Sequence, residues 1–295
     1  MDNVSLANTL SSPKLCMFNT YVHFKRPDQS TLMTYVNESS ENESADLFIF
    51  DEKGEQAIPV ISQEVDAGSN AQFDLKKVLG KENFTGSALL VIRPSNRNSE
   101  TFSAKNKDCV YTFLSPNTSV EIGTAAHTTL NAPGEKEKKT FNMFCTAVLS
   151  NEKVKTLIAI YNHSTDPRYS DRVSLKPKLQ NLNGEGLEGP EKQVPAFGSY
   201  ILDVDESFGV EGRSLLEKTG GRGSITLQHK GHTFGSFFFH MDKESEALIS
   251  GSHTQPPTGI FSNPESLWHY WLTPLAKRFP FSTQAVALAR IFRKK

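Results

Sequence analysis

The stretch that decides the fold is Thr31-Leu-Met-Thr-Tyr-Val-Asn37-Glu-Ser39, which recurs later in the chain as Thr156-Leu-Ile-Ala-Ile-Tyr-Asn162-His-Ser164. Each stretch is rich in β-branched and aromatic residues and ends at Asn, which is typical of a strand that runs into a turn. Because a repeated unit sets the architecture of a whole chain, this repeat predicts an all-β protein built from two copies of one domain.

Four further pairs of segments keep the same order in the two parts of the chain. They are 18–21 with 141–144, 65–75 with 194–204, 86–91 with 223–228, and 127–128 with 253–254. One such match arises readily by chance, whereas five in a constant order indicate an internal duplication. The segment between the copies, 129–140, is polar, charged and interrupted by Pro133-Gly134, as a linker between domains is.

The duplication divides the chain into five parts. These are an N-terminal extension (1–17), a first β-sandwich repeat (18–128), the linker (129–140), a second β-sandwich repeat (141–254) and a tail (255–295). We expect two tandem β-sandwich domains of immunoglobulin-like topology, although the Cys…Trp…Cys pattern of immunoglobulin domains is absent.

Local patterns add three expectations about elements. No helix of more than about two turns is predicted before residue 262. Lys230-Gly231 is predicted to form the tight turn of a hairpin. The run Phe237-Phe238-Phe239 predicts a strand that is buried on both faces or lies at an interface.

Composition narrows the class of protein. The 295 residues carry 32 Lys or Arg and 33 Asp or Glu, a net charge of −1, so no nucleic-acid partner is expected. Three cysteines without metal spacing and an N-terminus without a secretory pattern predict a reduced, cytoplasmic protein. No GxSxG, P-loop, Rossmann or HExxH motif occurs, so no cofactor is indicated. The acidic loop 37–46 lacks calcium spacing and is expected to be solvated.

The tail differs in charge from the rest of the chain. Residues 263–295 hold six Lys or Arg against one Glu, a net charge of +5, which leaves −6 for the remainder. Asn263-Pro264 and Ser282 are typical helix starts, so a short helical tail is predicted. The candidate binding residues are Trp268, Trp271, Lys277, Arg278, Arg290 and Arg293. Three interpretations stay open: the aromatic residues pack on the second sandwich, the tail attaches to an acidic membrane surface, or it binds a protein partner.

Four histidines are the candidates for chemistry. His127 and His253, the catalytic candidates, stand at equivalent positions of the two copies, so they either meet in one site or satisfy backbone groups in closing loops. His229 and His232 flank the predicted turn, where cross-strand pairing would bring two imidazoles within reach of a metal ion. No third ligand is evident, and exposed turn residues are the alternative.

Two classes of function remain, with a third that is purely structural. The first is a non-catalytic binding or adaptor protein, which two sandwiches and a docking tail would form. The alternative is an enzyme with a histidine-containing, metal-dependent or metal-free site between the repeats. An oligomeric scaffold joined through β-edges is the structural hypothesis. An approach of His127 to His253 would favour the enzyme.

Overall fold

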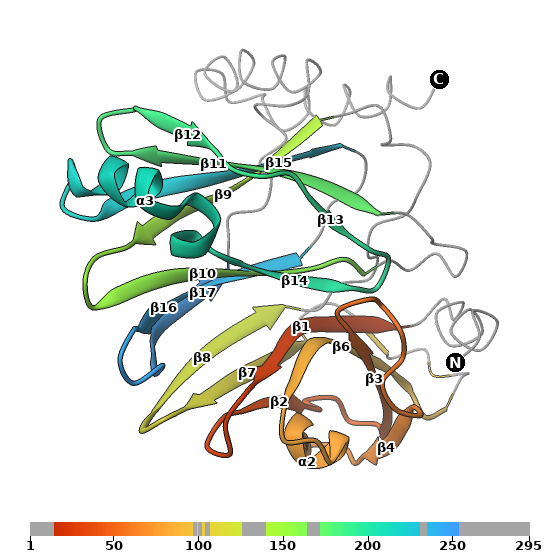
Figure 1. Ribbon diagram of the computed structural model, residues 1–295. Coiled ribbons are helices and arrows are strands. Elements are labelled where there is room, and N and C mark those ends of the chain that lie inside the picture. Colours follow the sequence, from red (N-terminus) through yellow and green to blue (C-terminus); the bar gives the residue numbers. More distant parts are fainter. Residues whose placement is uncertain are drawn as a thin grey trace, which may run out of the picture.

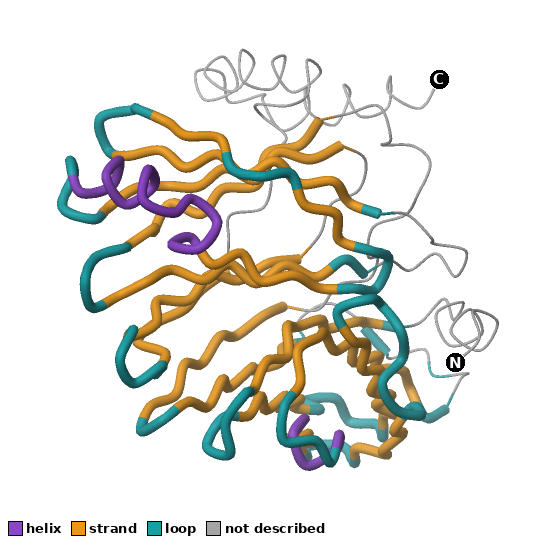
Figure 2. The backbone as a smooth tube through the Cα atoms, in the orientation of Figure 1, coloured by secondary structure: helices purple, strands orange, loops and turns teal. Residues whose placement is uncertain are grey.

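The computed structural model describes residues 15–96, 99, 102–103, 107–125, 140–163, 172–230 and 235–253. Strands make up most of this part of the chain, and two helices accompany them (Figure 2). All strand pairs within the four sheets are antiparallel. The expected all-β class is therefore confirmed.

The first half of the chain forms two four-stranded sheets (Figure 1), with the orders β1-β6-β3-β4 and β5-β2-β7-β8. The elements are β1 Cys16–Phe24, β2 Ser30–Val36, β3 Glu43–Asp51, β4 Ile61–Val65, β5 Asn70–Asp74, α2 Leu75–Leu79, β6 Phe84–Pro94, β7 Asp108–Ser115 and β8 Thr118–Ala125. Strands β1 and β2 lie in different sheets. This order differs from the constant-type immunoglobulin order, in which the first two strands share a sheet.

The second half repeats this order of strands. Its sheets are β9-β15-β11-β12, with β13 also paired to β11, and β14-β10-β16-β17. The elements are β9 Thr140–Leu149, β10 Val154–Tyr161, β11 Val173–Asn181, β12 Gly186–Glu188, β13 Lys192–Val194, β14 Ser199–Asp203, α3 Val204–Glu217, β15 Arg222–Lys230, β16 Gly235–Asp242 and β17 Leu248–His253. Each first-half strand therefore has a counterpart at the matching sheet position.

Matching asparagines make matching hydrogen bonds in the two halves. The Asn37 side chain donates to the carbonyls of Val65 and Asp66, at 3.0 and 3.2 Å. The Asn162 side chain donates to the carbonyls of residues 194 and 195, at 3.2 and 3.1 Å. Both amides satisfy the backbone of the turn that leads into the next strand, as suits an Asn at which a strand runs into a turn.

In each half a helix directly follows the corresponding strand, α2 after β5 and α3 after β14. Asp74 caps α2 by accepting from the Lys77 N–H group, and Asp203 caps α3 by accepting from two N–H groups of its first turn. At 14 residues α3 is longer than the two turns expected. Gly209, with the non-helical angles φ 57° and ψ −144°, interrupts the helix.

The predicted hairpin at Lys230-Gly231 is wrong. Strand β15 pairs with β9 and β11, whereas β16 pairs with β10 and β17 in the other sheet of the same half. Strands β15 and β16 therefore lie in different sheets. A run of alternating residues identifies a strand but not its hydrogen-bonded partner, and Gly231 suggested a turn that the sheet order does not contain.

The strand 235–242 packs on both faces, one side of it buried and the other partly buried. Phe238 packs on the core of the second half, whereas Phe237 and Phe239 join the core of the first half. One strand thus contributes to both cores.

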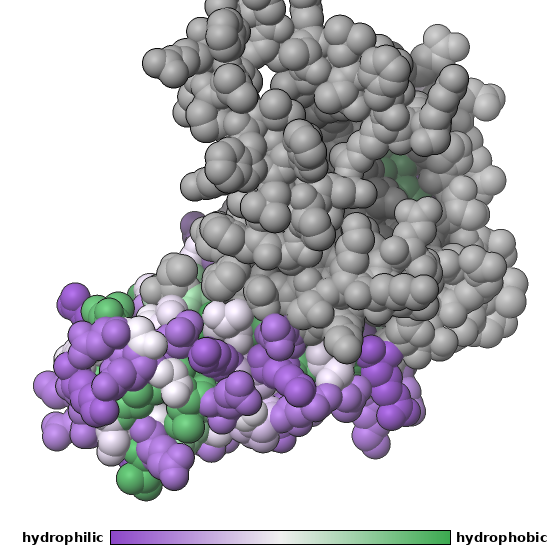
Figure 3. All heavy atoms as spheres, turned by 90° about the horizontal axis from the view of Figure 1, so that it is seen from above, coloured by the Kyte–Doolittle hydropathy of each residue, from purple (hydrophilic) through white to green (hydrophobic). Residues whose placement is uncertain are grey.

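The surface carries few large hydrophobic side chains among the described residues. Val36, Leu182, Val210 and Ile249 are the exposed ones, at 42%, 65%, 69% and 54%. Seen from above, the described residues are mostly hydrophilic, with isolated hydrophobic ones (Figure 3). Scattered exposure of this kind does not define a docking surface.

Candidate functional site

The sheet β14-β10-β16-β17 lies between the other sheet of its half and the first half of the chain (Figure 1). The residues that it turns toward the first half are Leu157, Ala159, Tyr161, Phe237, Phe239 and Met241, and they share one hydrophobic cluster with the first-half interior. We call this contact the seam. Because a continuous apolar core crosses it, the two halves form one packed body.

An aromatic cluster occupies the centre of the seam. The Phe237 ring lies 5.8 Å from that of Tyr111, 5.9 Å from that of Phe113 and 5.7 Å from that of Tyr161. The first two contacts are edge-to-face, the arrangement that aromatic quadrupoles favour. Such contacts fix the orientation of the two halves.

The edge strands β8 and β17 face each other across the seam. The Thr118 hydroxyl donates to the Leu248 carbonyl at 2.7 Å, and the Leu248 N–H donates to Ser115 Oγ at 2.9 Å. His253 Nε2 donates to the Gly123 carbonyl at 3.1 Å. Each edge is therefore covered by the other half, which blocks these two edges from pairing with further strands.

The geometry of His253 matches the backbone-satisfying role that was one of its two interpretations. Its ring packs 4.8 Å from that of Phe237, and its Nε2 proton is engaged by a carbonyl. His127 lies outside the described residues, so the proposed meeting of the two histidines stays a prediction.

A histidine that the sequence analysis did not select is buried in the seam. His163 Nε2 lies 2.8 Å from Ser87 Oγ, and Ser87 donates its own proton to the Phe197 carbonyl at 3.1 Å. The Ser87 oxygen can then accept the Nε2 proton. Burial lowers the pKa of His163 to about 3, so the imidazole is neutral at pH 7. Its position after the repeated strand gave no signal of this role.

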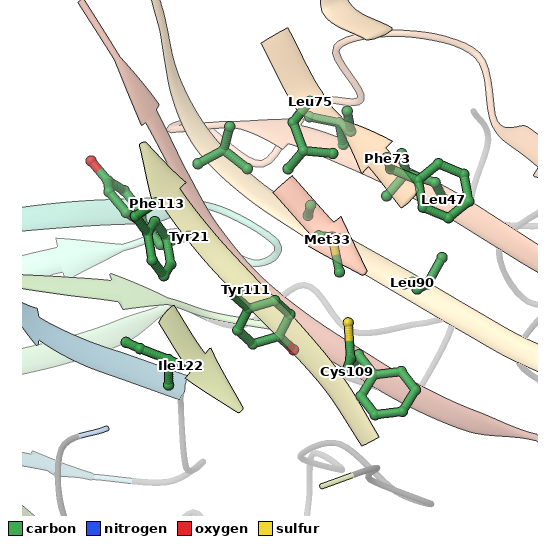
Figure 4. Packing of buried hydrophobic residues seen from close by; sticks show 14 of the residues in the cluster. Tyr21, Met33, Leu47, Phe73, Leu75, Leu90, Cys109, Tyr111, Phe113 and Ile122 are labelled. Carbon is green, nitrogen blue, oxygen red and sulfur yellow. The ribbon is translucent and has the colours of Figure 1, made fainter. Parts of the chain in front are cut away.

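A small pocket lies in the seam beside His23. Its volume of about 30 Å³ admits on the order of one or two water molecules. Its walls are mostly apolar, and two of its lining residues, Tyr21 and Phe113, lie side by side in Figure 4. Burial lowers the pKa of His23 to about 4, and His23 Nδ1 lies 2.9 Å from Thr85 Oγ1. The pocket is too small to enclose a typical small-molecule ligand.

The three thiols are free and buried. Burial raises the pKa of Cys16 to about 12 and that of Cys145 to about 11, and it raises the pKa of Cys109 as well. Because the thiolate is the reactive species, these cysteines act as small apolar side chains.

An ionic cluster is buried inside the first half. Lys107 Nζ lies 2.5 Å from Glu43 Oε1 and 3.1 Å from the Tyr35 hydroxyl, which itself donates to Glu43. Glu43 is 1% exposed, so the expectation that the loop 37–46 is solvated throughout is wrong. The charge is tolerated because a cation more than 60 residues away in the sequence reaches it, a pairing that no local pattern indicates.

Of the remaining candidate residues, His229 alone lies within the described part of the chain. His229 lies in β15 opposite Leu175 and Phe141, and β15 does not pair with β16. The cross-strand geometry on which the metal hypothesis depended is therefore absent at His229. Further candidates lie outside the described residues, namely His232, Trp268, Trp271, Lys277, Arg278, Arg290 and Arg293.

The described residues include neither a candidate metal-binding group nor a helix that could span a membrane. No group of three His, Cys, Asp or Glu side chains in this part of the chain could hold a metal ion. None of the helices described is long and apolar enough to cross a bilayer.

Comparison with known proteins adds only a remote structural likeness. No family model and no curated protein matches the chain. It is similar to a β-glucuronidase from Bacteroides uniformis, at 10% identity and a TM-score of 0.21, over 85% of this chain and 28% of that one. It is also similar to a putative β-galactosidase from Bacteroides fragilis, at 9% identity and a TM-score of 0.21, over 82% of this chain and 32% of that one. The chain thus spans less than a third of these proteins, and such TM-scores support no argument about function.

Proposed function

We propose that this protein is a non-catalytic binding or adaptor protein. Its two β-sandwich halves form a rigid scaffold, and 255–295 attaches that scaffold to a protein partner or to an acidic membrane surface. The seam is the observation that supports a scaffold, because a shared core and crossing hydrogen bonds hold the halves in one orientation.

The two halves are, in this proposal, copies of one ancestral sandwich. Their identical strand order supports this, together with the matching bonds of Asn37 and Asn162 and the matching caps at Asp74 and Asp203. Repeats that bury a common face are mutually stabilising, which suits a scaffold.

The protonation states of the three buried thiols and of two buried histidines also support binding over catalysis. Burial raises the pKa of each thiol and lowers the pKa values of His23 and His163, so all of them are uncharged at pH 7. Catalytic groups instead need pKa values near the working pH and access to a substrate.

The tail supplies the docking function in this proposal. Its net charge of +5 and its two tryptophans suit an acidic surface, to which basic residues are attracted and at which aromatic rings lie at headgroup level. We place the protein in the cytoplasm, with peripheral attachment to a membrane.

Liposome flotation tests the membrane form of the proposal. The full chain, a 1–262 truncation and the fourfold variant Lys277→Glu, Arg278→Glu, Arg290→Glu, Arg293→Glu are mixed with vesicles with and without phosphatidylserine. We expect only the full chain to float, only with the anionic lipid, and to be released by salt.

The matched control reverses two exposed lysines of β11, Lys176→Glu and Lys178→Glu, and should float normally. Equal flotation of the fourfold variant would contradict electrostatic docking. If no form floats, the membrane surface is excluded. A truncation that is then less stable than the full chain would indicate a tail packed on the second sandwich.

The enzyme remains the competing proposal. Metal analysis of the purified chain separates it from a binding protein: stoichiometric zinc that is lost in His232→Ala would favour a metal-dependent site. A metal-free chain would exclude the metal-dependent enzyme. If His253→Ala folds normally, activity measurements on that variant test the metal-free enzyme.

A further inference from the structure

The turns 65–69 and 194–198 occupy matching positions in the two halves. The Gly68 N–H donates to the Asn37 carbonyl at 2.9 Å, and the Phe197 N–H donates to the Asn162 carbonyl at 2.7 Å. The φ angles are +70° at Gly68 and +58° at Phe197. Glycine adopts this left-handed conformation readily, whereas a bulky residue is strained in it. The second half therefore holds a strained phenylalanine where the first half has a relaxed glycine.

Contacts of Phe197 with the first half compensate for this strain. Its side chain is buried, its ring stacks on that of Phe50 at 5.1 Å and 28°, and its carbonyl accepts from Ser87. A Cβ placed on Gly68, in contrast, would meet nothing within 4 Å. Of the two matching turns, only 194–198 carries a side chain at this position that packs on the other half.

The backbones on the two sides of this contact lie too close for side chains. A Cβ on Gly198 would lie 2.5 Å from the Glu52 carbonyl oxygen, and one on Gly54 would lie 1.9 Å from the Ala196 carbonyl oxygen. The Ser199 N–H donates to the Glu52 carbonyl at 3.3 Å. The turn 194–198 is thus seated directly against the turn 51–54.

We propose that the turn 194–198 is a releasable latch on the seam, and that the Phe197 side chain anchors it in the first half. Strain at a residue that only its surroundings hold in place is characteristic of elements that switch between two states. Withdrawal of the ring relaxes the turn and uncovers Phe50. This goes beyond the proposed binding function, because it gives the scaffold a closed and an open state.

Native-state hydrogen exchange of the unmodified protein tests whether the latch opens separately. At low guanidinium concentration, the Ser199 amide should exchange at least tenfold faster than amides in the middle of β6, with a weaker dependence on denaturant. If both groups exchange only with global unfolding, at equal rates and with equal denaturant dependence, the latch does not exist as a separate element.

Two substitutions test the anchor. Phe197→Gly removes the ring and the strain together, and should raise exchange in the segment 51–55 at least tenfold. Gly68→Ala introduces strain at the matching turn without touching the seam, and should leave exchange in 51–55 unchanged. Unchanged exchange in 51–55 for Phe197→Gly would overturn the proposal. If that variant fails to fold, Phe50→Leu keeps the turn intact and should raise exchange of the Ser199 amide, whereas no rise would count against the latch.

Discussion

Asn37 and Asn162 each tie a strand end to the following turn through a buried side-chain amide. The sequence predicts this because both residues end a repeated strand and Asn suits turns. It does not predict the left-handed conformation of Phe197, since the compensating ring of Phe50 comes from the other half of the chain. At the residue scale, local polar roles are readable and long-range compensation is not.

Removing either buried amide should destabilise the fold. Asn37→Ala and Asn162→Ala each remove side-chain hydrogen bonds to two backbone carbonyls of a turn, so the free energy of unfolding should fall by about 2–3 kcal/mol in urea titrations. The exposed residue Gln63 is a control, and Gln63→Ala should stay within about 0.5 kcal/mol of the unmodified protein. Losses that small at both asparagines would contradict the capping role.

Acid should weaken the protein through its buried imidazoles. The pKa values of His23 and His163 are about 4 and about 3 in the folded chain, against an ordinary value of 6.5. As the pH falls below 6.5, the unfolded chain takes up protons first, so stability is full above that pH and declines toward pH 4. At pH 5 the loss should be about 2 kcal/mol per histidine.

Urea midpoints measured between pH 7.5 and 5 for the unmodified protein and for His163→Gln check this expectation. The variant is less stable at pH 7.5 and should lose about half as much stability on acidification. Parallel curves for the two proteins would show that His163 does not titrate as its burial implies.

At the scale of elements, β16 shows what a pattern can and cannot specify. Three consecutive phenylalanines predict a strand that is buried on both faces or lies at an interface; Phe237 and Phe239 are buried in the first-half core, and Phe238 is partly buried against the second. The pattern also predicts a hairpin of this strand with β15, which is wrong because alternation carries no information about the pairing partner. The ionic pair of Glu43 and Lys107 was missed for a related reason, since its two members lie on distant elements.

Truncating the central ring of the seam should be costly. Phe237→Ala leaves a cavity among three aromatic rings, so the free energy of unfolding should fall by about 3–5 kcal/mol. Val210, which is 69% exposed, provides the control, and Val210→Ala should change stability by less than about 0.5 kcal/mol. A loss below about 1 kcal/mol at Phe237 would mean that the seam is loosely packed.

For the whole molecule, the sequence predicts two halves of similar pattern, and the halves share one strand order, whereas no pattern predicts the seam. Burial on both faces suggested that some strand meets a second surface, but no local pattern says which face of the second half meets which sheet of the first. His253 does contact the first half, through the Gly123 carbonyl, but the histidine buried at Ser87 is His163, which no pattern singled out. Relative placement depends on complementarity of entire faces, which neither periodicity nor spacing encodes.

Neither half should be stable alone. A fragment of residues 15–125 lacks the sheet that covers Tyr111 and Phe113, so it should bind a hydrophobic dye and unfold without a cooperative transition. Mixing it with 126–295 should restore a cooperative transition, which calorimetry detects. Cooperative melting of 15–125 by itself would show that the seam is dispensable for folding.

The shared core also has a consequence in time. The chain is made from its N-terminus, so residues 15–125 leave the ribosome before the sheet that covers them exists. At typical synthesis rates of about 5–20 residues per second, the interval until His253 is made is on the order of ten seconds. Throughout that interval Phe113 and its neighbours face water beside the unpaired edge of β8, so newborn chains of this protein depend on molecular chaperones more than two independent sandwiches would.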